Sequence, residues 1–264
     1  MNTATMAQTT PSVEWQKRRM HHIFATDGRA VIVAMDHGIT GVVPGLIDVR
    51  SAVRAVVSGG ADAVMTTVGM GRAVGAILGG TGWIMVLDSE RSVAGYGVDE
   101  AIREGADAVE LKVFPGSSSD NKLGELRELV ARASALGLPM MAEAIPVSFT
   151  DTAAHTVENI ASAARICAEA GADFVKVPFA STADRYRAVI DASFAPVLVL
   201  GGSLQADPVA ALELAADAMA SGARGVVFGR NVFQAPDPER MVAALCEVVH
   251  GGAEVSQARR LIER

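Results

Sequence analysis

Short apolar runs alternate with longer stretches of helical spacing along most of the chain. A turn that begins with glycine precedes four of the apolar runs. Its sequences are Gly60-Ala61-Asp62, Gly105-Ala106-Asp107, Gly171-Ala172-Asp173 and a degenerate fourth copy, Gly222-Ala223-Arg224. Each copy follows an Ala-rich stretch and leads into β-branched residues. A glycine in the left-handed position just past a helix ends that helix, so each copy predicts a helix, a tight turn and a strand.

Four further apolar runs lie between these copies and complete a set of alternating elements. We expect these strands at residues 30–35, 83–87, 139–145 and 196–200, and helices at 121–136, 157–170 and 208–221, among others. Continuously apolar strands are typical of parallel sheets covered on both faces. Eight strands alternating with helices favour an α/β fold, a single (β/α)8 TIM barrel. The rival is an open doubly wound sheet, but no G-x-G-x-x-G motif follows Met35.

Length and composition suit one such domain. The chain has 264 residues, half of them hydrophobic, and a net charge of −7 without a basic stripe. We therefore expect no nucleic-acid partner, and no apolar run approaches the ~18 residues of a membrane span. Residues 1–24 are interpreted as an N-terminal extension, a flexible lead followed by a short helix over 14–24, and residues 25–264 as the barrel domain.

The cysteines and histidines indicate neither a disulfide framework nor a metal site. Cys167 and Cys246 lie in apolar helical segments, where buried thiols are the expected state. The five histidines are not spaced as metal ligands. We expect a cytoplasmic protein that uses no cofactor and no metal.

In a barrel of this kind the chemistry lies at the carboxyl ends of the strands, and a lysine interrupts one of them. Lys176 stands among Phe174, Val175, Val177 and Phe179. A dry barrel interior favours the neutral amine, which can attack a carbonyl and form a Schiff base. The alternative is a structural lysine, or one whose head reaches the rim and binds an anion.

Three more charged residues stand at strand ends. Lys112 would favour a neutral Lys176 if the two were close, or would form a salt bridge with Glu110 on its own strand face. Asp36 could move protons or orient a substrate hydroxyl, or could cap the following loop. Glu143 is either a buried acid–base group or the partner of a lysine.

The last two strands end in glycines that could hold an anion. Gly201, Gly202 and Ser203 offer backbone amides before a helix, and Gly229 with Arg230 adds an open backbone and a guanidinium. Loops after strands seven and eight often bind phosphate in this fold. The alternative is a pair of ordinary turns. His37, beside Asp36, is either a substrate contact or a packed, hydrogen-bonded loop histidine.

Taken together, these motifs resemble a known superfamily over residues 18–250. They are Ala34-Met35-Asp36-His37-Gly38, Val175-Lys176, Leu200-Gly201-Gly202 and Gly229-Arg230-Asn231-Val232-Phe233-Gln234. They are similar to motifs of the archaeal-type class I fructose-bisphosphate aldolases and other DeoC-like aldolases, including aminodideoxyheptulosonate synthase and an autoinducer phospho-thiolase. The resemblance implies a TIM barrel, a Schiff-base lysine, an acid–base aspartate, a phosphate site and a homo-oligomer, often a decamer.

One position departs from that resemblance. The aldolases and the heptulosonate synthase carry a proton-shuttling tyrosine before proline at the end of strand five, where this chain has Ile145. Val147-Ser148 replaces the usual Arg-Gly. Glu143 could take over the proton transfer, and Tyr96 is a weaker candidate. The departure casts doubt on fructose 1,6-bisphosphate as the substrate.

The leading hypothesis is a class I, metal-independent aldolase, an aldehyde-lyase. It would make or break a carbon–carbon bond in a phosphorylated ketose or related sugar phosphate, with dihydroxyacetone phosphate as one fragment. Three alternatives stay open at this point: thiolase-like acyl transfer from a phosphorylated diketone to coenzyme A, an FMN oxidoreductase, and a sugar-phosphate binder without activity.

Overall fold

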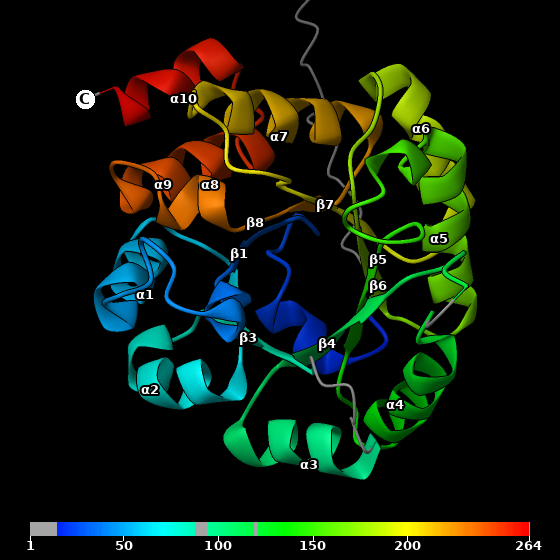
Figure 1. The fold of residues 1–264 in the computed structure, drawn as a ribbon. Helices are drawn as coiled ribbons and strands as arrows, with labels where there is room; N and C mark the ends of the chain where they lie inside the picture. Colours follow the sequence, from blue (N-terminus) through cyan, green and yellow to red (C-terminus); the bar gives the residue numbers. More distant parts are fainter. Residues whose placement is uncertain (1–14, 88–93, 119–120, 264) are drawn as a thin grey trace, which may run out of the picture.

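The chain folds into one closed barrel of eight parallel strands. The structure is a computed structural model that describes residues 15–87, 94–118 and 121–263, without the side chains of 94–96. The strands are β1 Ala30–Ala34, β2 Ala63–Thr66, β3 Gly82–Val86, β4 Ala108–Val113, β5 Met140–Ala144, β6 Phe174–Val177, β7 Val197–Leu200 and β8 Gly225–Phe228. Each pairs with the next along the chain, and β8 closes onto β1 (Figure 1). The predicted barrel is confirmed, and the open sheet is excluded.

Helices surround the barrel on its outer side (Figure 1). They are α1 Val49–Ser58, α2 Val68–Leu78, α3 Ala94–Glu104, α4 Leu123–Ala135, α5 Val157–Glu169, α6 Ala183–Ala192, α7 Val209–Ser221, α8 Arg230–Phe233, α9 Pro238–Val249 and α10 Val255–Ile262. Short 3₁₀ segments are η1 Arg18–His22, η2 Asp36–Thr40 and η3 Thr152–Ala154. The three helices that we bounded from the sequence, α4, α5 and α7, lie within two residues of the expected limits.

Alternate strand residues face the barrel interior, which positions the site. In β6, Phe174 packs with the interior cluster, whereas Val175 and Val177 pack with the outer cluster beneath the helices. Lys176 therefore points inward, and the strand period places Glu143 and Lys112 on the same side. Both faces of each strand are buried, which explains the continuous apolar runs.

The repeated glycine turns form the opposite end of the barrel. Gly60, Gly105, Gly171 and Gly222 have φ values of 93°, 83°, 100° and 99°, the left-handed conformation that the helix ends require. Each repeat aspartate accepts a backbone hydrogen bond from the first residues of the preceding strand. The N–H groups are those of Val31 to Asp62, Trp83 to Asp107 and Met140 to Asp173. The sequence indicated the glycines, but not this role of the aspartates.

The N-terminal segment closes that end of the barrel. Met20, Ile23 and Phe24 are buried in the interior cluster, and Lys17 Nζ donates to Asp173 Oδ2 at 2.7 Å. The helix expected over 14–24 is present but shorter, as a 3₁₀ helix over Arg18–His22. Its apolar side chains insert into the barrel instead of forming one stripe. The flexible segment expected before this helix lies outside the described residues. The domain division after residue 24 stays a prediction.

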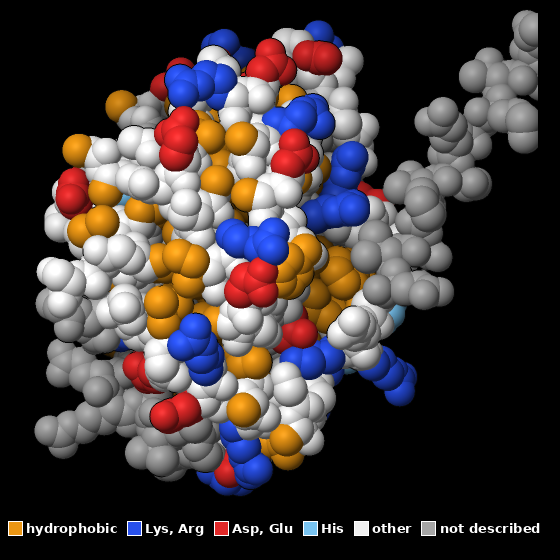
Figure 2. Space-filling view, turned by 90° about the vertical axis from the view of Figure 1, so that its right-hand side faces the viewer, with side chains coloured by type: hydrophobic (Ala, Val, Ile, Leu, Met, Phe, Trp, Pro, Cys, Tyr) orange, Lys and Arg blue, Asp and Glu red, His pale blue; other side chains and the backbone are white. Residues whose placement is uncertain are grey.

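Surface and thiol chemistry agree with the composition. Over α4–α6, Lys and Arg side chains lie interspersed with Asp and Glu (Figure 2). Cys167 is buried and Cys246 half-buried, and burial raises both thiol pKa values to about 12. None of the helices in the described ranges is long and apolar enough to cross a membrane. The cytoplasmic location stays a prediction.

Candidate active site

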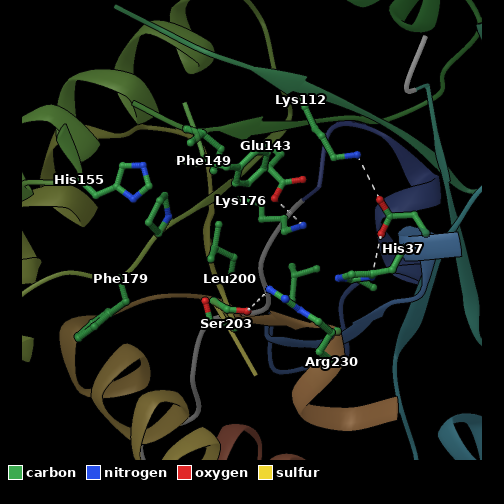
Figure 3. Close-up of a pocket in the computed structure, with 18 of the residues that line it drawn as sticks. His37, Lys112, Glu143, Phe149, His155, Lys176, Phe179, Leu200, Ser203 and Arg230 are labelled. Carbon is green, nitrogen blue, oxygen red and sulfur yellow. Dashed lines mark hydrogen bonds and ion pairs between the residues drawn. The ribbon is translucent and has the colours of Figure 1, made fainter. Parts of the chain in front are cut away.

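One cavity of about 600 Å³ opens at the carboxyl end of the barrel (Figure 3). All ten residues singled out from the sequence line it: Asp36, His37, Lys112, Glu143, Lys176, Gly201, Gly202, Ser203, Gly229 and Arg230. They come from six of the eight strand ends. The topology brings them together because the carboxyl ends of all eight parallel strands meet at one rim.

Three charged residues form a row across neighbouring strands. Lys112 of β4 is the register partner of Glu143 in β5, and Glu143 is the register partner of Lys176 in β6. Lys176 Nζ lies 2.8 Å from Glu143 Oε1, and both residues are buried, at 5% and 3% exposure. Glu143 Oε2 has no hydrogen-bond partner among the described residues. Lys176 therefore lies inside the cavity in direct contact with the carboxylate of Glu143.

Asp36 pairs with the second lysine. Lys112 Nζ donates to Asp36 Oδ2 at 3.2 Å. Burial by itself raises the pKa of Asp36, but the charges of Lys112 and Lys176 outweigh it, and the net pKa is lowered. Asp36 is therefore a carboxylate near the amine of Lys176. Both lysines of the cavity have an acidic partner, and Arg230 adds a third positive charge.

Glu110 lies one inward position earlier on β4 than Lys112. The expected alternative of a Glu110–Lys112 salt bridge is wrong, because Lys112 bonds Asp36 and neither oxygen of Glu110 has a hydrogen-bond partner among the described residues. Glu110 is fully buried, and this burial raises its pKa well above the usual range. The buried position therefore favours the neutral carboxylic acid over the carboxylate.

His37 is packed but not hydrogen-bonded through Nδ1. Its ring meets Phe233 edge-on at 5.2 Å between centroids, and Nδ1 is buried without a hydrogen-bond partner among the described residues, 3.7 Å from Asp36 Oδ1. Burial lowers the imidazole pKa, and the charge of Asp36, which acts in the opposite direction, does not outweigh it. The site therefore favours the uncharged ring of His37. Its neighbour Gly229 must lack a side chain, because a Cβ there would lie 2.5 Å from His37 Cε1.

The glycine loops after β7 and β8 are tied to each other. Arg230 Nη2 donates to the Gly202 carbonyl at 3.2 Å, and Asn231 Nδ2 donates to the Gly201 carbonyl at 2.9 Å. Asn231 Oδ1 accepts from the Gln205 N–H at 2.8 Å. Gly202 has a φ of 66° and open space beside its Cα. Arg230 Nε is buried without a partner among the described residues, so it has a hydrogen bond left to donate.

Sequence reasoning missed much of the cavity wall. Phe149 and His155 come from the segment between β5 and α5, and Phe179 follows β6. These positions carry no periodicity, so no pattern pointed to them. Asn231 stood in a quoted motif, but its backbone contacts with Gly201, Ser203 and Gln205 could not be anticipated. The side chain of Tyr96 lies outside the described part of the chain.

Comparison with known proteins identifies the family. The model of the DeoC/LacD family aldolases matches residues 30–235. The 2-amino-3,7-dideoxy-D-threo-hept-6-ulosonate synthase of Halobacterium salinarum is 34% identical over 244 residues, 89% of this chain and 91% of that protein. Synthase 1 of the same name from Archaeoglobus fulgidus is 35% identical over 256 residues, 92% and 94% of the two chains.

Solved structures agree with that result. A Schiff-base-forming fructose-1,6-bisphosphate aldolase is 27% identical with a TM-score of 0.77, over 88% of this chain and 98% of that one. An archaeal fructose-1,6-bisphosphate aldolase, with its catalytic lysine bound to the carbinolamine intermediate, is 26% identical with the same TM-score and the same coverage. The resemblance drawn from the motifs is confirmed. By its sequence and its fold, the chain belongs to the DeoC/LacD family of aldolases.

Proposed function

We propose that this chain is a class I aldolase that joins dihydroxyacetone phosphate to an aldehyde, or cleaves the resulting phosphorylated ketose. The observation that carries the proposal is the buried amine of Lys176, which faces the cavity 2.8 Å from a carboxylate. Relatives whose catalytic lysine binds substrate covalently support it. The reaction also needs a base, charged groups that stabilise its intermediates, and a site that binds the phosphate.

Lys176 is the proposed nucleophile. Glu143 accepts a proton from the ammonium, and the free amine adds to the ketone carbon of dihydroxyacetone phosphate. Glu143 gives this proton to the carbinolamine hydroxyl, which leaves as water, so that Glu143 is a carboxylate again. The iminium that remains draws electrons from the neighbouring C–H bond. Removal of that proton gives an enamine, whose carbon attacks the aldehyde carbon. Water then releases the product ketose and the lysine.

Glu143 is the proposed base at carbon. It lines the same cavity as Ile145, which occupies the tyrosine position here, and it already contacts the amine. One carboxyl group can take the proton from the iminium's neighbouring carbon and return it to the new hydroxyl oxygen. Asp36, ionised between Lys112 and His37, is proposed to orient the substrate hydroxyls.

The loops after β7 and β8 are the proposed phosphate site. Gly201, Gly202 and Gly229 leave the backbone open, and Arg230 supplies a guanidinium with an unused Nε–H. Phosphate sites in this fold commonly use these two loops. Bidentate contact between a guanidinium and a phosphate is both strong and directional. The predicted homo-oligomer is not required for this assignment.

Deuterium exchange tests the proposal without knowledge of the aldehyde. In D₂O, the enzyme should replace one C3 proton of dihydroxyacetone phosphate, as followed by proton NMR, because the enamine forms before any aldehyde binds. Lys176→Met should abolish the exchange, and the matched variant Lys122→Met should retain it, because Lys122 does not line the cavity. Exchange that needs coenzyme A, or no exchange by the folded wild type, would reject the proposal.

A further inference from the structure

The cavity has a second wall, which the chemistry above leaves unused. Ile145 and Phe149 line it from the segment after β5, Phe179 lines it from the segment after β6, and Ile39 of η2 also contributes. Figure 3 shows Phe149 and Phe179 across the cavity from His37. Phe149 is 45% exposed and Ile39 53% exposed, so both present apolar surface at the cavity. An apolar ligand that covers such surface removes it from water, which makes binding more favourable.

The two phenyl rings are held in place from behind. Phe149 meets Phe114 edge-on at 5.8 Å between centroids, and Phe179 packs on Tyr186 at 4.4 Å. Tyr186 is buried and donates its O–H to the Pro178 carbonyl at 2.6 Å. Because both rings are already packed, a ligand that binds them loses little affinity to the entropy cost of fixing their side chains.

The charges of the described cavity lie elsewhere. Lys176 pairs with Glu143, Lys112 pairs with Asp36, and Arg230 belongs to the glycine loops. His155 lies nearer to the rings, but its Nε2 is 2.9 Å from the Ser148 carbonyl. A carbonyl oxygen only accepts, so Nε2 carries a hydrogen that this bond uses. Among the described side chains, this wall offers no lysine or arginine for a second phosphoryl group.

We infer that the wall is a subsite for an uncharged, apolar carbon chain or ring, so the substrate carries one phosphoryl group and an apolar far end. The inference rests on the proposed function, since it takes the phosphate to lie at the loops after β7 and β8. It names the aldehyde class: an alkyl or aryl aldehyde instead of a phosphorylated one. A bisphosphate would place its second charge against phenyl rings and lose hydration without a counter-charge.

Calorimetry with two probes of the same six-carbon chain tests the subsite without requiring turnover. Hexyl phosphate ends in a methyl group, whereas hexane-1,6-diol bisphosphate carries a second phosphoryl group on the oxygen of that last carbon. Hexyl phosphate should bind at least tenfold more tightly than the bisphosphate, and more tightly than inorganic phosphate. Equal or tighter binding of the bisphosphate, or no gain over inorganic phosphate, would overturn the inference.

Ring deletions locate the preference. Phe149→Ala and Phe179→Ala should each reduce the ratio of the two affinities by about tenfold. Phe194→Ala is the matched control, because Phe194 is 65% exposed on the outer surface beneath Arg165 and away from the cavity. A ratio that survives both deletions contradicts the assignment. Deuterium exchange by the same preparations separates this outcome from failure of the aldolase proposal.

Discussion

Lys176 Nζ and Glu143 Oε1 lie 2.8 Å apart, from register partners on β6 and β5 inside the cavity. A buried lysine fixed to a carboxylate away from any cavity would have argued for a structural ion pair. Here the carboxylate shares the cavity with the amine, and its second oxygen has no partner among the described residues. The pair can therefore hold a proton between its members and release it to a bound substrate.

Glu143→Gln should separate proton transfer by Glu143 from Schiff-base formation at Lys176. The amide keeps the shape but cannot take a proton, and general bases contribute roughly 10²–10⁴-fold to rate. We expect proton exchange with dihydroxyacetone phosphate to fall by at least about 100-fold, while some Schiff base still forms at Lys176. Glu158→Gln, on the exposed face of α5, is the control. Full exchange activity in Glu143→Gln would remove Glu143 from the mechanism.

Lys112→Met should destabilise the fold through Asp36. Removing one member of a buried pair costs about 3–5 kcal/mol, because the other charge stays buried without compensation. Urea unfolding at neutral pH should show a loss of this order. The double variant Lys112→Met/Asp36→Asn should regain part of it, since no Asp36 carboxylate is then left without its lysine. A double variant less stable than the single one would show that the pair is not the cause.

Glu110→Gln should become more stable relative to the wild type as the pH rises. The pKa of Glu110 is raised in the folded state, so folding keeps a proton that the unfolded chain releases above about pH 4.3. The free energy of unfolding of the wild type therefore falls as the pH rises through this range, and glutamine removes that dependence. Urea unfolding from pH 4 to 8 measures the difference. A difference independent of pH would mean that Glu110 is ionised in the fold.

His250 should stabilise the opposite end of the barrel only below alkaline pH. Hydrogen bonds with Asp62 and Asp27 raise its pKa to about 9. A raised histidine pKa stabilises the fold fully below the unfolded value, near pH 6.5, and the effect disappears as the pH rises through about 9. His250→Asn should lose roughly 2 kcal/mol at pH 6 and much less at pH 10. An equal loss at both values would indicate packing alone.

The barrel could be predicted from the sequence because its signals are local. The glycines at 60, 105, 171 and 222 each end a helix through a backbone conformation that side chains disfavour, and the apolar runs between them have strand length. The site could be predicted as a set for a topological reason, since carboxyl ends of parallel strands share one rim.

The pairing within that site could not be predicted. Asp36 and Lys112 are far apart in the chain, and only barrel closure brings them within 3.2 Å. The sequence-based partner of Lys112, Glu110, shares its strand face but makes no hydrogen bond among the described residues. Phe149 and Phe179 follow strand ends, where no periodic pattern marks a side chain as cavity-facing. Such contacts depend on three-dimensional packing and not on local propensity.

Covalent trapping tests the central claim most directly. The chain has four lysines, at positions 17, 112, 122 and 176, so a modified peptide can be assigned without ambiguity. Borohydride reduction in the presence of dihydroxyacetone phosphate should add the mass of the reduced ligand to the peptide that contains Lys176, and to none in Lys176→Met. An unmodified Lys176 peptide, in a preparation that exchanges the substrate's protons with solvent, would contradict the Schiff-base account.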